Sequence, residues 1–396
     1  MTTDAQAPEF NPFDPTFRSD PYPAYARLRE HAPVRRTSDI GVYTVACYDD
    51  VTHVLKSPAI FSSAAMGAAT MTGTQVRSII SSDPPQHTQM RNLVNRAFTP
   101  RMVADMEPRI REIARALLDA VEARGGAGID VVRDLAVPLP VTVIAEILGV
   151  DAERRDDFKR WSNAVIMNIN NADRQEQMRA SSDREEFELY FAQMTDERRK
   201  EPRDDLISAL VAAEEGDLRL SPDEVVSFAM LLLIAGNETT TNLIGNAMLA
   251  LLDHPDQLAM VQKDPSQIPN MVEEALRWDS PVQFLFRVTT QDTEVHGVPI
   301  PKDAGVVPMY ASANRDSARF PDGDRFDITR NTQGHVAFGL GPHFCLGAPL
   351  ARLEARVAFE ELFARFPRFD RTSNDVDRLD SMFLRGLRSL PLRVEL

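Results

Sequence analysis

The residues with the most distinctive chemistry stand together in one short segment, Phe338-Gly339-Leu340-Gly341-Pro342-His343-Phe344-Cys345-Leu346-Gly347. Gly339 and Gly341 permit backbone turns that residues with a Cβ resist. Cys345 precedes a helix predicted to begin near Gly347, and the N–H groups and dipole of a helix start favour a thiolate there. Gly347 would also let a flat cofactor approach the backbone. No second Cys or His stands at metal-ligand spacing, which excludes a structural zinc site and an iron–sulfur cluster. A single thiolate does suit the one axial position of a haem.

The alternative is that Cys345 is an inert buried cysteine beside a glycine-rich turn. We adopt that interpretation for Cys47, which stands in a strand-like run and is given no role. Around Cys345, however, the pattern Phe-Gly-x-Gly-x-His-x-Cys-x-Gly is matched at every defined position. This segment resembles the haem-ligand signature of the cytochrome P-450 family. The resemblance implies that Cys345 is the iron ligand and that Phe338, Gly339 and Gly347 lie against haem b.

A second segment, Ala235-Gly236-Asn237-Glu238-Thr239-Thr240, breaks the pattern of the long apolar helix predicted around it. A carboxylate and two hydroxyls are costly to bury without partners, and a helical glycine costs up to ~1 kcal/mol relative to alanine. Gly236 would let the helix open locally, and the Thr239 hydroxyl would replace a backbone partner or hold a water. A kinked core helix with satisfied polar groups is the alternative. Beside the cysteine motif, the segment resembles the family's acid–alcohol pair, in which some members carry Asp as the acid. The resemblance implies that Glu238 and Thr239 relay protons to iron-bound dioxygen.

Three further residues match a structural element of the same family. Glu274 and Arg277 stand three residues apart on one predicted helix face, a spacing that by itself describes any surface ion pair. Their position between the two motifs resembles the family's Glu-x-x-Arg element. Arg325, in a Pro-containing stretch before the cysteine loop, matches the usual third partner. We interpret all three as structural residues that hold the region presenting Cys345.

Haem propionates need cationic or hydrogen-bond-donating groups at the haem edge. His87 and Arg91 stand at i and i+4 of one predicted helix, Arg287 ends an apolar, Pro-containing stretch, and His343 stands two residues before the cysteine. All four match propionate-binding positions of the family. His335 is left undecided between this role and that of a loop histidine with its own partners.

The resemblance also indicates where a substrate would lie. Its pocket is expected to be lined from the long helix, from the stretch after residue 281 and from the C-terminal loop by Leu231, Ile234, Ala235, Val282, Gln283, Phe284, Leu285 and Phe383. The segment 62–80 and the helices between residues 154 and 200 would form its lid. The lining residues are almost all apolar and include no charged anchor, which suits a lipophilic small molecule without identifying it.

The elements that must position these residues are mainly helical. Ser221-Pro-Asp-Glu224 opens the longest helix with a capping box. Apolar periodicity predicts helices at 22–30, 86–98, 100–124, 139–148, 154–169, 182–200, 204–215, 221–252, 268–278 and 347–366. Strands are predicted within 41–48, 284–290, 293–295, 306–310 and 390–394. No repeat or composition break divides the chain, so we expect a single domain over residues 1–396. The resemblance implies the triangular, prism-like cytochrome P-450 fold, mainly α with a small β portion.

Composition bears on the partners of the protein and on its place in the cell. Lys and Arg number 44 against 59 Asp and Glu, a formal charge of −15, which disfavours a general polyanion binder and hence a nucleic-acid partner. The N-terminal residues lack the basic and apolar regions of a leader, and no apolar stretch is long enough to span a membrane. The two cysteines cannot form a disulfide framework. We therefore expect a cytoplasmic protein without a membrane segment, and a monomer.

Three functions compete. The favoured one is a monooxygenase that inserts one atom of O2 by hydroxylation or epoxidation. Its electrons would pass from NAD(P)H through a ferredoxin reductase and a ferredoxin, since the chain itself shows no flavin or iron–sulfur module. A peroxide-driven peroxygenase is disfavoured by Glu238 and Thr239, which such family members tend to replace. A haem-binding sensor would need neither that pair nor a substrate cavity.

An acidic ferredoxin would need a basic docking face on this acidic protein. Such a face is expected near the cysteine helix and the propionate helix, at Arg96, Arg101, Arg352 and Arg356. Internal pairing of these arginines, with Glu107 or Glu354, is an equal alternative.

Overall fold

The computed structural model describes residues 10–37, 40–64, 78–125, 128–168, 174–215 and 218–395. Its α-helices are α1 (Pro15–Ser19), α2 (Tyr22–His31), α3 (Tyr48–Lys56), α4 (Gln86–Ala97), α5 (Pro100–Asp105), α6 (Glu107–Ala123), α7 (Pro138–Leu148), α8 (Arg155–Asn168), α9 (Arg174–Lys200), α10 (Leu206–Ala212), α11 (Pro222–Asp253), α12 (Pro255–Lys263), α13 (Ile268–Trp278), α14 (Tyr310–Ala313) and α15 (Ala348–Arg365). A π-helical turn at Val131–Ala136 and short 3-10 helices, among them Gly341–His343, complete the helical part.

The strands form small sheets. A five-stranded sheet has the order β1 (Val34–Arg36), β2 (Tyr43–Val45), β10 (Gly305–Pro308), β7 (Arg287–Thr289) and β3 (Phe61–Ser62). Within it, β2 and β10 pair in parallel, with Thr44 opposite Val307, and the other described pairs are antiparallel. A second sheet joins β11 (Arg368–Arg371), β12 (Pro391–Glu395) and β4 (Gly128–Asp130). Two hairpins remain among the described residues: β5 (Glu214–Glu215) with β6 (Leu218–Arg219), and β8 (Thr293–Val295) with β9 (Val298–Ile300).

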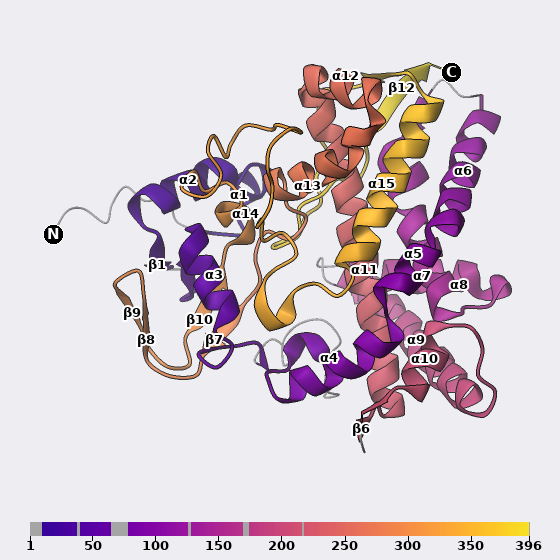
Figure 1. The fold of residues 1–396 in the computed structure, drawn as a ribbon, viewed down its shortest axis with the longest axis horizontal. Coiled ribbons are helices and arrows are strands. Elements are labelled where there is room, and N and C mark those ends of the chain that lie inside the picture. Colours follow the sequence, from indigo (N-terminus) through magenta and orange to yellow (C-terminus); the bar gives the residue numbers. More distant parts are fainter. Residues whose placement is uncertain are drawn as a thin grey trace.

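The longest helix, α11, organises the larger part of the molecule (Figure 1). It begins as the sequence predicts: the N–H of Glu224 donates to the Ser221 hydroxyl at 3.2 Å, and the N–H of Ser221 donates to the Glu224 carboxylate at 2.8 Å. These two bonds occupy donors that a helix start otherwise leaves free. Helices α7, α8, α9, α13 and α15 all pack against α11, so most of its residues are buried and the helix crosses the core.

The core is formed by one large apolar cluster among these helices, and two smaller clusters lie under the five-stranded sheet and around α2. The sheet, α2, α3 and α14 make up the smaller part of the molecule, and the segment leading to α15 runs between the two parts (Figure 1). Within the described ranges, no helix has both the length and the apolar character needed to cross a membrane.

Most predicted helices agree with the structure to within a few residues. The helix predicted at 182–200 begins earlier, at Arg174, and three further differences have local causes. The segment predicted as one helix at 100–124 forms α5 and α6, because Pro108 in the first turn of α6 has no N–H to continue the preceding helix. The helix predicted at 204–215 ends at Ala212, where the hairpin β5–β6 follows. Of the strand predicted at 41–48 only β2 forms, since Tyr48 begins α3 with two aspartates in its first turn.

Candidate active site

Residues 338–347 form an irregular loop ahead of α15. Gly339 and Gly341 both adopt the left-handed conformation, with φ of 70° and 72°. At Gly341 a Cβ would also meet the carbonyl oxygen of Leu55 at 2.6 Å, so only glycine fits. The N–H of Cys345 donates to the carbonyl of Phe338 at 2.9 Å, which closes the loop and fixes the cysteine in front of the helix.

The environment of the Cys345 sulfur contains opposing influences. The side chain keeps accessible surface, yet the protein atoms crowded around it raise the pKa of the thiol. The N–H groups of Gly347 and Ala348 and the charges of Arg91 and Arg352 act the other way and favour the thiolate. A Cβ at Gly347 would lie 3.9 Å from Sγ, so the glycine keeps that side of the sulfur open. Donors and cations directed at one accessible sulfur suit a metal-bound thiolate.

Two imidazoles lie beside this loop. The ring centroids of His87, on α4, and His343 are 4.2 Å apart. Both ring nitrogens of His87 and Nε2 of His343 are buried without a hydrogen-bond partner among the described residues. Burial, followed by His87 and Arg287, lowers the pKa of His343 to about 3, and burial with Arg91 lowers the pKa of His87. Unpartnered nitrogens beside two guanidiniums suit anionic groups such as two propionates.

Ala235 and Thr239, one turn apart on α11, both keep solvent-accessible surface. The Thr239 hydroxyl donates to the carbonyl of Ala235 at 2.6 Å, one turn earlier in the helix. Ala235 is exposed and Thr239 is partly exposed, so neither belongs to the packed core. The helix continues unbroken through Gly236, so the local opening expected there is wrong. The glycine instead lets α7 approach, since a Cβ at this position would lie 2.8 Å from Cδ1 of Ile144.

Burial disfavours the charged forms of two carboxyls in this region. It raises the pKa of Glu238 to about 7, so both forms of that side chain coexist near neutral pH. Glu354, on α15, is 1% exposed, and burial raises its pKa to about 8 despite a hydrogen bond with the Thr240 hydroxyl. That bond joins α15 to α11 beside Thr239. Glu354 is therefore not the surface partner of the arginines that the sequence allowed.

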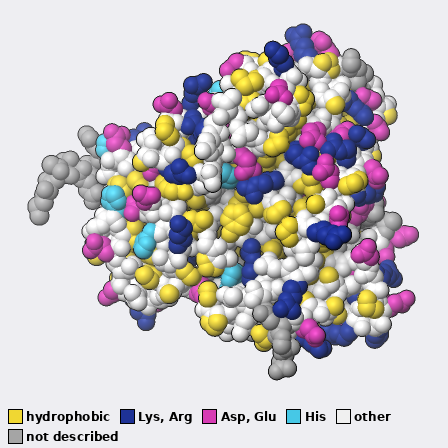
Figure 2. All heavy atoms as spheres, viewed as in Figure 1, with side chains coloured by type: hydrophobic (Ala, Val, Ile, Leu, Met, Phe, Trp, Pro, Cys, Tyr) yellow, Lys and Arg dark blue, Asp and Glu magenta, His cyan; other side chains and the backbone are white. Residues whose placement is uncertain are grey.

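Most of the arginines expected on a docking face are engaged. Arg352 and Arg356 are held by carboxylates of neighbouring elements, and Arg96 donates to a backbone carbonyl. Arg101 is 92% exposed, and its ion pair with Asp105 spans 3.8 Å. Figure 2 shows basic and acidic side chains interleaved over α6 and α15. The prediction of a basic docking face is thus wrong for Arg352 and Arg356, because both are paired with carboxylates of this chain.

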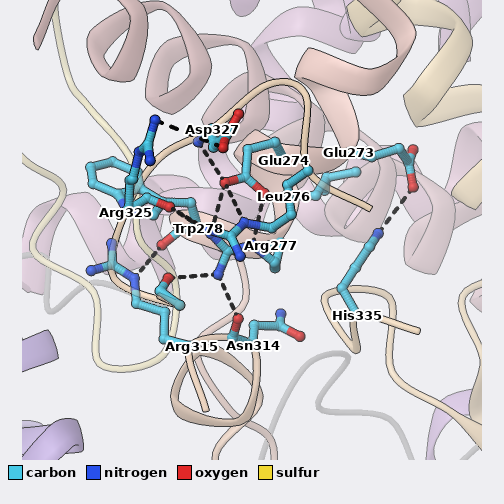
Figure 3. A network of polar contacts seen from close by, with 12 residues as sticks. Glu273, Glu274, Leu276, Arg277, Trp278, Asn314, Arg315, Arg325, Asp327 and His335 are labelled. Carbon is cyan, nitrogen blue, oxygen red and sulfur yellow. Dashed lines mark hydrogen bonds and ion pairs between the residues drawn. The ribbon is translucent and has the colours of Figure 1, made fainter. Parts of the chain in front are cut away.

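Glu274 and Arg277 lie at the centre of a buried polar network (Figure 3). Both side chains are 0% exposed, and the guanidinium donates to the two carboxylate oxygens at 2.7 and 2.8 Å. Its other N–H groups donate to the carbonyls of Asn314, Gly323 and Arg325. The pair is therefore buried with its donors satisfied, the condition under which such a pair is tolerated.

The third partner of Glu274 and Arg277 is Arg330, and the prediction for the Arg325 side chain is wrong. Arg325 is 66% exposed and turns toward Asp327, 4.0 Å away, so it contributes only its carbonyl (Figure 3). The Arg330 side chain is 11% exposed, with Nε 3.4 Å from Glu274. It also donates to backbone carbonyls of the 321–325 segment and so fixes the course of that loop.

The residues expected around the substrate divide into two groups. Val282, Leu285 and Phe383 are partly exposed, Ala235 is exposed, and Leu231 and Ile234 are buried in the helical core with little accessible surface.

Gln283 and Phe284 point into the N-terminal cluster instead. The amide of Gln283 is bonded to the Ser280 carbonyl and the Tyr25 hydroxyl. Phe284 is fully buried and packs edge-on against Phe10. Both side chains are taken up by contacts inside this cluster, so their assignment to the pocket is wrong. Of the expected lid segment, residues 65–77 and 169–173 lie outside the described residues.

This combination of fold and site defines a family. The family model described as "Cytochrome P450" matches residues 36–394. The chain therefore belongs to the cytochrome P450 family of monooxygenases, which use haem, dioxygen and electrons from redox partners. It is 44% identical to the vitamin D(3) 25-hydroxylase of Pseudonocardia autotrophica, with 96% of this chain and 95% of that protein aligned. It is 41% identical to the 6-deoxyerythronolide B hydroxylase of Saccharopolyspora erythraea, over 96% and 97% of the two chains. The solved structure of CYP109Q5 from Chondromyces apiculatus superposes with a TM-score of 0.91 at 47% identity, covering 98% of each chain.

Proposed function

We propose that this cytochrome P450 hydroxylates or epoxidises a lipophilic small molecule, using electrons from NAD(P)H that arrive through a ferredoxin reductase and a ferredoxin. One observation carries the proposal. An accessible Cys345 sulfur, with N–H donors and cations directed at it, lies near the unpartnered nitrogens of His87 and His343. These groups fit haem b, with Cys345 as its iron ligand and His87, His343, Arg91 and Arg287 as propionate anchors. When bound, the haem supplies the oxygen-activating chemistry.

In this proposal Glu238 and Thr239 hold and move protons. A carboxyl with a pKa of about 7 can release and regain a proton at neutral pH. The Thr239 hydroxyl is bonded to Ala235 through its hydrogen, so its oxygen remains able to accept a hydrogen bond from a reactant. The pair also favours a dioxygen-dependent reaction over a peroxide-driven one, which needs no proton delivery of this kind.

The proposed substrate is lipophilic because the accessible residues near the site are apolar. Ala235, Val282, Leu285 and Phe383 present no charge that would anchor an ionic group. Two relatives are named for hydroxylating vitamin D(3) and 6-deoxyerythronolide B, and we propose a substrate of similar character.

The proposed electron donor is an acidic ferredoxin that docks near Arg101, whose side chain is 92% exposed. We further propose that the chain acts as a single domain and a monomer in the cytoplasm, where free cysteines stay reduced. In Arg101→Glu, reduction by a ferredoxin should be slower and should depend less on salt, whereas dithionite reduction should be unchanged. Arg393→Glu, an exposed arginine on β12, is the matched control. Equal rates and salt dependence in wild type and Arg101→Glu would place docking elsewhere.

The function is tested by combining ligand titration with turnover. The haem-loaded protein is titrated with a fatty acid, a terpenoid, a steroid and a macrolide, and compounds that perturb the haem spectrum are incubated with ferredoxin, reductase and NAD(P)H. Oxygenated product should form only with the complete electron-transfer chain. Product formed equally fast with hydrogen peroxide alone would identify a peroxygenase. Haem binding without turnover of any compound would identify a sensor.

A further inference from the structure

Glu273, the residue before the buried Glu274, belongs to a separate polar cluster. Its carboxylate accepts from Arg352 at 2.6 Å (Nε to Oε1) and at 2.9 Å (Nη2 to Oε2). Nε2 of His335 lies 3.0 Å from Oε2 of the same carboxylate. Figure 3 shows Glu273 and His335 facing each other, away from the Arg277 network. The cluster therefore joins three segments: α13, α15 and the segment that leads into the cysteine loop.

The protonation of this cluster follows from its hydrogen bonds. The N–H of Ala337 donates to Nδ1 of His335 at 3.3 Å, so the ring proton lies on Nε2 and is donated to Glu273. Burial pushes the pKa of Glu273 up, but the hydrogen bonds from His335 and Arg352, together with the electrostatic attraction of these two side chains, outweigh burial and bring it down to about 2. Glu273 is thus a full negative charge at neutral pH, and Arg352 is its counterion.

Arg352 connects this cluster to the sulfur. It stands on α15, seven residues after Cys345, and its guanidinium carbon lies 4.5 Å from the ring centroid of Phe338. The carbonyl of Phe338 in turn accepts the N–H of Cys345. This contact places the positive charge of Arg352 beside the cysteine loop, where it attracts negative charge on the sulfur. Orientation and charge at Cys345 therefore both depend on where Arg352 is held.

We propose that Glu273 is a positioning residue for the reaction: it holds Arg352 against Phe338 and offsets part of the positive charge beside the Cys345 sulfur, and so sets the reduction potential of the iron bound there. Reduction adds one electron and makes the iron–thiolate centre more negative by one charge. A cation beside the sulfur stabilises this reduced form, and the carboxylate of Glu273 weakens that effect. The inference rests on the proposed role of Cys345 as the iron ligand. It gives His335 a role in holding Glu273 rather than in binding haem.

The test is a double-mutant cycle in which the reduction potential of the haem-loaded protein is measured for wild type, both single variants and the double variant. Glu273→Gln keeps the shape of the side chain and removes its charge, so the potential should rise. Arg352→Gln should lower it, and the double variant should lie close to wild type. Because Arg352 is about one-third exposed and partly screened by salt, each single shift should stay below a tenfold change in the equilibrium constant for reduction, ~59 mV for one electron. Glu360→Gln, which removes a carboxylate from Arg356 and Arg111 farther along α15, is the matched control and should leave the potential unchanged.

Opposite signs that cancel in the double variant would support the proposal, since simple loosening of the loop gives shifts of one sign that add. Shifts in one direction, or no shifts, with an intact thiolate spectrum would overturn it. If Glu273→Gln fails to take up haem, the proposal is tested by Arg352→Gln alone. The reduction potential of that variant must lie below that of wild type, and an unchanged value would overturn the proposal. Failure of the proposed ligand is distinguishable, because the wild-type protein would then lack a thiolate spectrum.

Discussion

Glu238→Gln removes a carboxyl whose charged form is disfavoured at its position in α11. Burial raises the pKa of Glu238 from 4.5 to about 7, which at ~1.4 kcal/mol per pKa unit corresponds to roughly 3 kcal/mol against the ionised form. Below pH 4.5 the side chain is protonated in both folded and unfolded protein, and no penalty applies. Between pH 4.5 and about 7 the folded state binds more protons, so wild-type stability falls as pH rises. Above pH 7 the full penalty is present.

The variant should therefore gain stability in a pH-dependent way. Chemical denaturation at pH 5, 6, 7 and 8 should give little difference between Glu238→Gln and wild type at pH 5, growing to roughly 3 kcal/mol in favour of the variant at pH 8. Asp253→Asn at the end of the same helix is the control, because its carboxylate is half exposed and should contribute at most ~1 kcal/mol at any pH.

Catalysis should change in the opposite direction. If Glu238 relays protons, product formation per NAD(P)H consumed should fall in Glu238→Gln. The wild-type rate should decline as pH rises through about 7, and the variant should lose that transition. A stability gain that is absent or independent of pH would show that the carboxyl is ionised in the folded protein and would refute the reasoning.

Three further predictions concern the relay, the buried network and the central helix. Thr239→Ala should bind haem and substrate but consume NAD(P)H with release of peroxide, whereas Thr239→Ser should keep its coupling; equal coupling in Thr239→Ala and wild type would remove the hydroxyl from the relay. Glu274→Gln should lower the free energy of unfolding by about 3–5 kcal/mol, because it leaves the fully buried Arg277 charge unpaired, while Asp105→Asn at an exposed pair should cost less than ~1 kcal/mol. A loss below ~1 kcal/mol for Glu274→Gln would contradict the structural role. Ser221→Ala should cost about 0.5–2 kcal/mol by removing the α11 cap, and an unchanged denaturation midpoint would show that the capping box is dispensable.

The features that the sequence predicts well are those with local causes. Three such features are the left-handed glycines before Cys345, the Ser221–Glu224 cap and the amphipathic helices. Each depends on residues close together in the sequence, so a short segment is enough to predict it. The break between α5 and α6 also has a local signal, Pro108, which the prediction of a single helix over 100–124 did not use.

Features that depend on the path of a loop could not be predicted in this way. Arg325 and Arg330 stand five residues apart in a stretch with no helical or strand period, and only the folded course of that loop shows which one reaches Glu274. The hydrogen bond between Thr240 and Glu354 likewise joins residues more than a hundred positions apart, and no sequence pattern predicts a contact over that separation. The orientation of Gln283 depends on a contact with Tyr25 near the other end of the chain.

The central claim, that Cys345 is the axial ligand of a haem, is tested most directly by the spectrum of the reduced, carbon monoxide-bound protein. Wild type and Cys47→Ser should both show the red-shifted Soret band of a thiolate-bound haem, because the Cys47 sulfur is directed at the Arg29 carbonyl in a weak bond. Cys345→Ser should lose that band while circular dichroism shows the same helical content. A red-shifted band that persists in Cys345→Ser would contradict the account.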